Sequence, residues 1–174
     1  MNKELIKSKL RTVKDFPIPG ILFWDITTVF KDPEALRLLD AELYELVKDK
    51  GITKVVGLES RGWPMATTLA IKLGAGFVPC RKPGKLPAET ITKTYSKEYG
   101  TDTIEIHKDA ITEDDVVLIH DDLLATGGSA NAAIELVKQF NPKKIYANFI
   151  IVLKDLPGIE RIPEDIEVTR LFDL

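Results

Sequence analysis

Two adjacent acids followed by a small-residue turn are the residues of this chain best suited to chemistry. Asp121 and Asp122 end an apolar run that begins at Val116, and the turn Ala125-Thr-Gly-Gly-Ser129 follows them. Small residues at a helix N-terminus present unpaired backbone N–H groups at the positive end of the helix dipole, which suits a phosphate. The two carboxylates suit sugar hydroxyls or a metal ion. The pattern therefore predicts a phosphate site between a strand and a helix.

Strand geometry sets a condition on the acidic pair. Consecutive strand residues point to opposite faces, so Asp121 and Asp122 can serve one ligand only if the strand ends there and the backbone turns. Without the turn, two acids that cap a helix would be an equally good interpretation. With the turn, a functional role is favoured. The turn lacks the Gly-Lys-Ser/Thr of an ATPase phosphate loop, which argues against an ATPase.

Length and composition predict one globular domain spanning residues 1–174. Hydrophobic residues make up 44% of the 174 and charged residues 29%, which is typical of a folded chain that buries about two thirds of its surface. The net charge of −3 argues against broad binding to nucleic acid or anionic membranes. No apolar run approaches the roughly 18 residues of a membrane span. Because Cys80 is the single cysteine and the first residues lack the apolar core of a signal peptide, a cytoplasmic location is expected.

Apolar periodicity predicts alternating helices and strands. Helices are expected over residues 3–13, 33–50, 63–73 and about 130–140, and strands over 54–58, 77–80, 116–119 and 144–153. The last strand is apolar on both faces, which predicts an interior position in a covered sheet. The alternation indicates an α/β fold with a mainly parallel central sheet flanked by helices.

Three polar clusters follow predicted strands. Glu59-Ser-Arg-Gly62, Arg81-Lys82 and the acidic pair all fall at carboxyl ends, where parallel sheets bind their ligands, so the clusters are expected to converge. The interval from Pro83 to Gly100 is polar and lacks a strong period, and we interpret it as a long loop or a loose hairpin. Loops of this length in compact domains are often lids.

The acidic pair and its turn resemble the ribose-5-phosphate signature of the type I phosphoribosyltransferases. Further segments match, in the same order, the members of that family that act on adenine. These segments are Phe16-Pro-Ile-Pro-Gly-Ile-Leu-Phe23, Asp25-Ile-Thr27, Gly57-Leu-Glu-Ser-Arg-Gly62, Arg81-Lys-Pro-Gly-Lys-Leu-Pro87 and Glu98-Tyr-Gly-Thr-Asp102. The resemblance runs nearly end to end, and several ordered motifs are far more specific than one turn.

The resemblance implies a fold with an N-terminal hood at about 14–30 and a flexible catalytic loop at about 81–103. It implies Mg²⁺-dependent transfer of the phosphoribosyl group of phosphoribosyl pyrophosphate to adenine, giving AMP and pyrophosphate. It also implies a homodimer. Two alternatives stay open: the same transfer to another purine or analogue, and a non-catalytic regulator that senses phosphoribosyl pyrophosphate.

The resemblance also assigns roles to the residues of both halves of the site. The 5′-phosphate is expected at Ala125, Thr126, Gly127, Gly128 and Ser129, and the ribose hydroxyls at Asp121 and Asp122. Pyrophosphate is expected at Glu59, Ser60, Arg61, Arg81, Lys82 and Lys85. Mg²⁺ is expected to be held mainly by substrate and water, without a directly assigned side chain.

The base is expected at the hood and the catalytic loop. Phe23 would stack on adenine, and the neighbouring Leu22 and Trp24 would pair with its edge through their backbones. Glu98 is the implied catalytic acid/base group, close to N7 of adenine.

The chain departs from the family pattern at three places. Trp24 replaces an arginine of the hood, and Trp63-Pro-Met-Ala-Thr67 replaces the usual segment after Gly62, which bears on base specificity. His120 replaces an apolar residue before the acidic pair, and we interpret it as a packed, hydrogen-bonded side chain rather than a catalyst. Cys80 is interpreted as a small buried hydrophobe.

Overall fold

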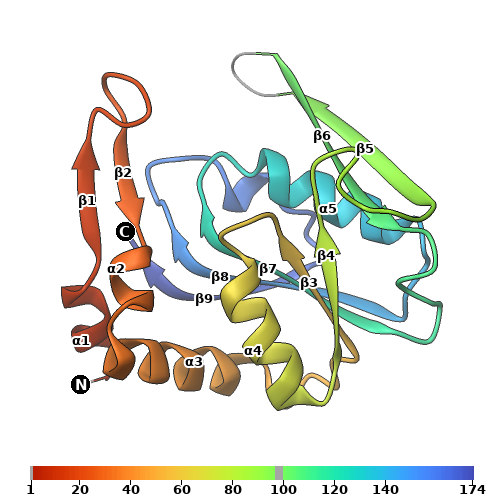
Figure 1. Ribbon diagram of the computed structural model, residues 1–174, viewed down its shortest axis with the longest axis horizontal. Helices are drawn as coiled ribbons and strands as arrows, with labels where there is room; N and C mark the ends of the chain where they lie inside the picture. Colours follow the sequence, from red (N-terminus) through yellow and green to blue (C-terminus); the bar gives the residue numbers. More distant parts are fainter. Residues whose placement is uncertain (1, 97–99) are drawn as a thin grey trace. The chain divides into compact units, whose positions relative to one another are not determined.

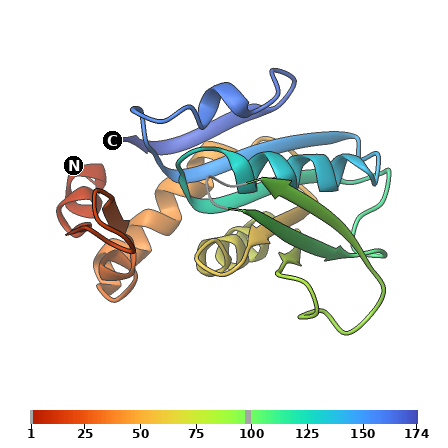
Figure 2. The same cartoon turned by 90° about the horizontal axis from the view of Figure 1, so that it is seen from above.

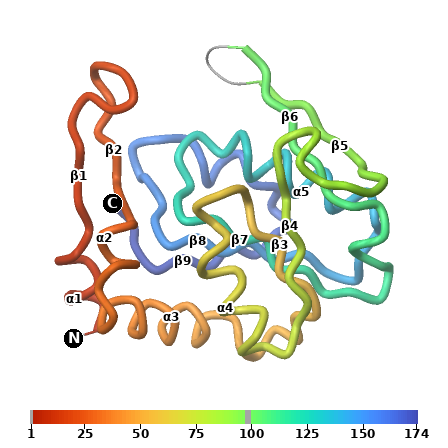
Figure 3. Tube along the Cα trace, viewed as in Figure 1, coloured from red at the N-terminus to blue at the C-terminus, as the bar shows by residue number. Residues whose placement is uncertain are grey.

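The chain is divided by its own contacts into two compact units. The computed structural model describes residues 2–96 and 100–174. The first unit is Met1–Glu45 and the second is Leu46–Leu174, so the boundary falls inside helix α3 (Pro33–Val47). Figure 3 traces the path of the chain, with the first unit in red and orange. Within the described ranges, no helix is both long and apolar enough to cross a membrane.

The first unit holds a hairpin between short helices (Figure 1). Its elements are α1 (Asn2–Ser8), β1 (Arg11–Lys14), β2 (Leu22–Asp25), α2 (Thr27–Phe30) and most of α3. The helix expected over 3–13 is wrong beyond Ser8. Thr12 and Val13 are β-branched residues that pair with Trp24 and Phe23 of β2 instead, and that pairing outweighs their helix-like spacing.

Helix α3 begins where its capping signal predicts. The side chain of Asp32 accepts hydrogen bonds from the backbone N–H groups of Glu34, at 3.1 Å, and Ala35, at 3.0 Å. These bonds satisfy two of the N–H groups that a helix start leaves unpaired, and Pro33 contributes no N–H group of its own. The prediction of a helix from Pro33 is confirmed, although it ends at Val47.

The second unit is built on a five-stranded parallel sheet in the order β4-β3-β7-β8-β9. The strands are β3 (Lys54–Leu58), β4 (Gly76–Cys80), β7 (Val116–Leu124), β8 (Lys144–Val152) and β9 (Glu167–Asp173). Helix α4 (Trp63–Leu73) contacts β3, β4 and β7, and helix α5 (Gly128–Lys138) contacts β7 and β8. The predicted parallel α/β sheet is confirmed, and β8 has the expected interior position between two neighbours.

A second, two-stranded sheet occupies the interval that the sequence left without a period. Strands β5 (Thr90–Ser96) and β6 (Thr101–His107) pair antiparallel, from Thr90 with His107 to Ser96 with Thr101. Figure 2 shows this hairpin beside α5, which β5 contacts. Of the two interpretations of the interval, the hairpin is the one that forms, and it extends beyond Gly100. Three threonines in β5 favour an extended backbone.

Polar side chains form a row across the interior of the large sheet. The register aligns His120, Asn148 and Thr169 on three neighbouring strands, with Gly57 of β3 beside His120. His120 is fully buried, and its Nδ1 lies 2.7 Å from Oδ1 of Asn148, whose amide donates to the Thr169 hydroxyl at 2.8 Å. Because this amide orientation turns its oxygen to the histidine, Nδ1 carries the proton. The interpretation of His120 as a packed, hydrogen-bonded side chain is confirmed.

The burial of His120 makes the stability of the protein pH-dependent. Burial lowers the pKa of this histidine from 6.5 to about 4, so the unfolded chain takes up the proton first as the pH falls. We expect the wild type to lose about 2 kcal/mol more than His120→Gln between pH 7 and pH 5, from about 1.4 kcal/mol per pKa unit. Urea unfolding of both proteins at the two pH values measures this, and parallel pH dependences would contradict it.

Candidate functional site

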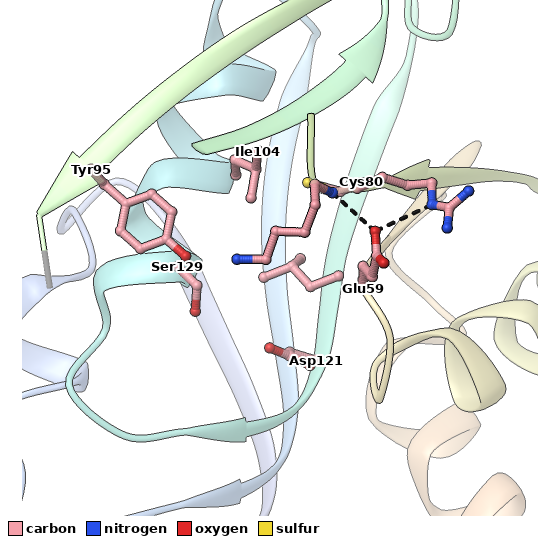
Figure 4. A pocket seen from close by; sticks show the side chains of 9 residues that line it. Glu59, Cys80, Tyr95, Ile104, Asp121 and Ser129 are labelled. Atoms are coloured by element: carbon pink, nitrogen blue, oxygen red, sulfur yellow. Dashed lines mark hydrogen bonds and ion pairs between the residues drawn. The ribbon is translucent and has the colours of Figure 1, made fainter. Parts of the chain in front are cut away.

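A pocket at the carboxyl ends of β3, β4 and β7 gathers residues from all three predicted polar clusters (Figure 4). It is lined by Leu58, Glu59, Cys80, Arg81, Lys82, Tyr95, Ile104, Asp121 and Ser129. Figure 4 shows Tyr95 and Ser129 on one side of the pocket and Glu59 on the other, with Asp121 between them. The predicted convergence is confirmed.

Strand β7 does not end before the acidic pair. The strand expected over 116–119 continues through both acids to Leu124, because its pairing with β8 continues to Val152. The condition that the strand should end at the pair is therefore not met. Asp121 lines the pocket, whereas Asp122 is 2% exposed and its Oδ2 lies 3.2 Å from Nε of Arg61. The two carboxylates thus have different environments.

Burial raises the pKa of both acids, and the effect is stronger on Asp121. For Asp121, burial acts together with the negative charge of Asp122, while the hydrogen bond from the backbone N–H of Asp122 and the positive charge of Arg61 oppose them. For Asp122, burial is opposed mainly by the guanidinium of Arg61. The two acids therefore form a buried pair that takes up a proton more readily than exposed carboxylates do.

Glu59 organises the predicted basic cluster. Its Oε2 accepts hydrogen bonds from Nε of Arg81 at 3.2 Å and from the backbone N–H of Lys82 at 2.9 Å. Although burial opposes it, these bonds hold the pKa of Glu59 below its usual range. Glu59 is thus an ionised acid that orients two cationic residues, a more specific role than the sequence indicated.

Trp63, one of the departures from the family pattern, contacts this cluster. Its Nε1 donates to the carbonyl of Gly57 at 2.9 Å, and the guanidinium carbon of Arg81 lies 5.1 Å from the centroid of its ring. Arg81 also donates to the carbonyl of Lys85 at 3.0 Å. An arginine over an indole face gains cation–π stabilisation. Trp63 and Glu59 together therefore hold Arg81 at the pocket.

Lys82 is held by the β5–β6 hairpin. Its Nζ forms an ion pair with Asp102 of β6, and the hydroxyl of Tyr95 lies 3.5 Å from the same carboxylate oxygen. Burial and the charge of Asp102 raise the pKa of Tyr95 to about 12, so its hydroxyl stays protonated. Each of three predicted pyrophosphate cations is thus paired with a carboxylate: Arg61 with Asp122, Arg81 with Glu59 and Lys82 with Asp102.

Glu105, a buried acid of β6, shapes the loop after Arg81. Its carboxylate accepts the backbone N–H groups of Lys85 and Leu86, each at 3.2 Å. The backbones of Arg81 and Glu105 are also hydrogen-bonded to each other in both directions, at 3.0 and 2.8 Å. The basic loop is therefore anchored to the hairpin by its backbone, and its cationic side chains project from a fixed base.

The predicted phosphate turn, residues Ala125–Ser129, lies at the start of α5. Gly127 is the N-cap with φ +82°, a left-handed conformation that favours glycine, and the helix begins at Gly128. The first N–H groups of an α-helix have no partner within the helix, so the start of α5 offers donors that the helix itself does not use. Ser129 lines the pocket. The placement of this turn at a helix N-terminus is confirmed.

Other predicted site residues lie outside the pocket lining. Leu22, Phe23 and Trp24 belong to β2 in the first unit, where the rings of Phe23 and Phe16 pack edge to face with centroids 5.0 Å apart. Glu98 lies outside the described residues. The roles of these residues stay predictions.

Sequence reasoning missed the contribution of the hairpin. Tyr95 and Ile104 line the pocket and Asp102 holds Lys82. The threonine-rich run over Thr90–Ser96 was the available signal for a strand. Cys80 was interpreted correctly as a buried hydrophobe: it is 1% exposed, and burial raises the pKa of its thiol to about 12, so it is no nucleophile at neutral pH.

Removing Asp122 should destabilise the protein as well as the site. Asp122→Ala leaves Arg61 without its buried carboxylate, and we expect a loss of about 2 kcal/mol in the free energy of unfolding, less than for a fully buried pair because Arg61 is 40% exposed. Urea unfolding measures the loss. Asp165→Ala removes an exposed carboxylate that pairs with Lys138 at 3.0 Å, and it should unfold close to wild type. Equal midpoints for the two variants would contradict the prediction.

A family model described as the phosphoribosyl transferase domain matches residues 25–172 of the chain. Among curated proteins, the adenine phosphoribosyltransferase of Phocaeicola vulgatus is 62% identical over 174 residues, covering 100% of both chains. That of Bacteroides thetaiotaomicron is 60% identical over 174 residues, covering 100% of this chain and 99% of the relative. The similarity therefore extends through both units.

Solved structures agree with these similarities. The adenine phosphoribosyltransferase of Rhodothermus marinus superposes with a TM-score of 0.94 at 50% identity, covering 99% of this chain and 98% of that one. The enzyme of Saccharomyces cerevisiae, solved with an imino-altritol bisphosphate and adenine, has a TM-score of 0.91 at 42% identity and covers 98% of each chain.

Proposed function

The chain belongs to the phosphoribosyltransferase family, and we propose from this premise that it transfers the phosphoribosyl group of phosphoribosyl pyrophosphate to adenine, giving AMP and pyrophosphate. One observation of the structure carries the proposal. The pocket places Asp121 and Ser129 of a ribose-5-phosphate signature beside Arg81 and Lys82 of a basic loop. The first pair of residues suits a sugar phosphate, and the second suits a polyanionic leaving group.

The reaction breaks the bond from the anomeric carbon to pyrophosphate and forms one from the anomeric carbon to the unprotonated N9 of adenine, while the proton that adenine carries on N7 passes to the carboxylate of Glu98. Positive charge builds on the ribose and negative charge on the leaving group, so the protein contributes mainly by positioning and electrostatic stabilisation. The phosphate turn holds the 5′-phosphate with backbone N–H groups. Arg61, Arg81, Lys82 and Lys85, with Ser60, receive the pyrophosphate, while Glu59 keeps Arg81 and Lys82 in place.

The acidic pair is proposed to hold the ribose hydroxyls, and because β7 continues through both acids, Asp122 can join Asp121 at one ligand only after a local rearrangement of the strand end. Asp121 supports this role by lining the pocket that Ser129 also lines. Asp122 is bound to Arg61, so its part in ribose binding requires it to exchange that guanidinium for a hydroxyl. The exchange would release Arg61 for pyrophosphate, which links the two halves of the site.

Mg²⁺ is the proposed cofactor, and the residues present fit it. Within the described ranges no three His, Cys, Asp or Glu side chains group into a metal site, whereas Asp121 presents a carboxylate to the pocket. Mg²⁺ is commonly bound by one or two carboxylates, water and substrate phosphates. When bound, the ion would neutralise pyrophosphate oxygens that otherwise repel one another, and it would be held mainly by substrate and water, with the carboxylate of Asp121 available at the pocket.

Adenine recognition is proposed for the hood. Phe23 stacks on the base, and the backbones of Leu22 and Trp24 pair with its edge, which supplies selectivity that stacking alone lacks. Trp24 provides one donor and no charge where the family pattern has arginine, so we propose that the backbone pairing carries more of the specificity in this chain.

Turnover tests the proposal directly. Purified protein mixed with adenine, phosphoribosyl pyrophosphate and Mg²⁺ should form AMP, and adenine should have the highest kcat/KM in a panel of purines. Folded protein that forms no AMP would refute the activity. A higher kcat/KM for another purine would refute only the choice of base, and binding without turnover would favour the regulator.

Glu98 is proposed as the group that exchanges a proton with adenine near N7. Glu98→Gln keeps the size of the side chain and removes its basicity, so we expect kcat to fall by about 10²-fold or more with little change in the affinity for phosphoribosyl pyrophosphate. Steady-state kinetics and substrate titration separate these effects. An unchanged kcat would remove Glu98 from the catalytic set.

A homodimer and a cytoplasmic location complete the proposal. The homodimer is supported by the family to which the chain belongs. The location is supported by the single cysteine, which is buried and leaves no partner for an internal disulfide.

A further inference from the structure

The phosphate turn lies directly against a segment that no sequence motif marks, Gly158 and the short helix η1 (Ile159–Arg161). A Cβ atom built on Gly127 would lie 2.8 Å from the carbonyl oxygen of Gly158. One built on Gly158 would lie 2.3 Å from the carbonyl oxygen of Ala125 and 2.9 Å from Cγ of Leu124. Real Cβ atoms essentially never come within 3.0 Å of such neighbours, so the two backbones touch only because both residues are glycine.

The backbone conformation does not explain glycine at position 158. Its φ of −59° and ψ of −48° are helical values that any L-residue adopts. Gly127 differs, because its φ of +82° favours glycine whatever the space around it. Glycine is therefore required at position 158 only because a side chain there would prevent the close approach to Ala125.

The end of β5 also contacts the turn. A Cβ atom on Gly128 would lie 3.5 Å from the ring of Tyr95 and 3.7 Å from the carbonyl oxygen of Ser96, which is ordinary contact. The end of β5 and the Gly158 segment thus both lie against the turn. The N–H group of Leu153 donates to the carbonyl of Leu124 at 3.0 Å, which ties the chain leading to Gly158 to the end of β7.

We infer that Gly158 is a positioning residue for phosphoribosyl transfer. Its backbone forms a wall behind Ala125 and Gly127, and this wall sets where the N–H groups of the turn point. Gly158 itself does not touch the ligand in this inference. The inference rests on the proposed function, because it takes Ala125–Ser129 as the site of the 5′-phosphate.

The test is Gly158→Ala in the full chain. The added methyl group must displace Ala125 or η1, and a shift of about 1 Å should weaken ribose 5-phosphate binding by about 10- to 100-fold and raise the KM for phosphoribosyl pyrophosphate similarly. The affinity for pyrophosphate alone should stay within about twofold, because the basic loop is anchored to β6 instead. A general loss of structure would weaken the binding of both ligands.

Gly76→Ala is the matched control. Gly76 begins β4, and its Cβ atom would meet only the flexible side chain of Lys54, at 3.2 Å or more. This variant should bind both ligands as the wild type does. Wild-type affinity for ribose 5-phosphate in Gly158→Ala would overturn the inference, as would equal weakening of both ligands. If the wild type itself does not bind ribose 5-phosphate, the proposed function fails instead.

Hydrogen exchange of the wild type tests the same inference if Gly158→Ala does not fold. Ribose 5-phosphate should slow exchange of the amides at 126–129 and also of those at Gly158–Ile162, since the wall and the turn move together. Protection confined to the turn would overturn the inference. Lack of protection at the turn would instead place the phosphate elsewhere.

Discussion

The parallel pairing of β3 with β4 and β7 is the constraint on which the site depends. Leu58 pairs with Cys80 and Gly57 with His120, so the residues that follow them lie at the same end of the sheet. Glu59 and Arg81 come directly after β3 and β4, and Asp121 lines the same pocket from within β7, which continues to Leu124. These residues are far apart in the chain, and the register of the strands brings them together. The row of residues behind them, in which His120 and Asn148 are fully buried and hydrogen-bonded to each other, keeps that register from slipping.

Charge is balanced inside the site by the protein itself. A site for a polyanion must hold several cations close together, and their mutual repulsion is costly unless carboxylates lie among them. Asp122, Glu59 and Asp102 have this position, each from a different strand or strand end. The pairs of Arg81 and Lys82 are partly exposed on both partners and contribute little to stability, whereas Asp122 beside Arg61 is buried. An anion that enters the pocket would therefore exchange partners with these carboxylates rather than fill a charged cavity.

The elements predicted well are those whose own sequence determines how they are buried. The helix at 63–73 and the strand at 144–152 carry periods that need no knowledge of their neighbours, and both form as expected. The hairpins are different. Val13 and Tyr95 lie in half-exposed strands that form because a partner strand pairs with each of them. The extension of β7 through Asp122 likewise depends on its pairing with β8. Local patterns carry little information about such pairing.

The sequence by itself determined the chemistry: which acids, cations and small residues are present, in which order, and next to which strands and helices. It also determined the family, because ordered motifs identify a family without coordinates. Only the tertiary structure decided what each residue touches. It gave Asp121 and Asp122 different neighbours, placed Trp63 against Arg81, and brought Gly158 into contact with the phosphate turn. The physical reason is that these contacts depend on strand register and close packing, which join residues whose positions in the chain are unrelated.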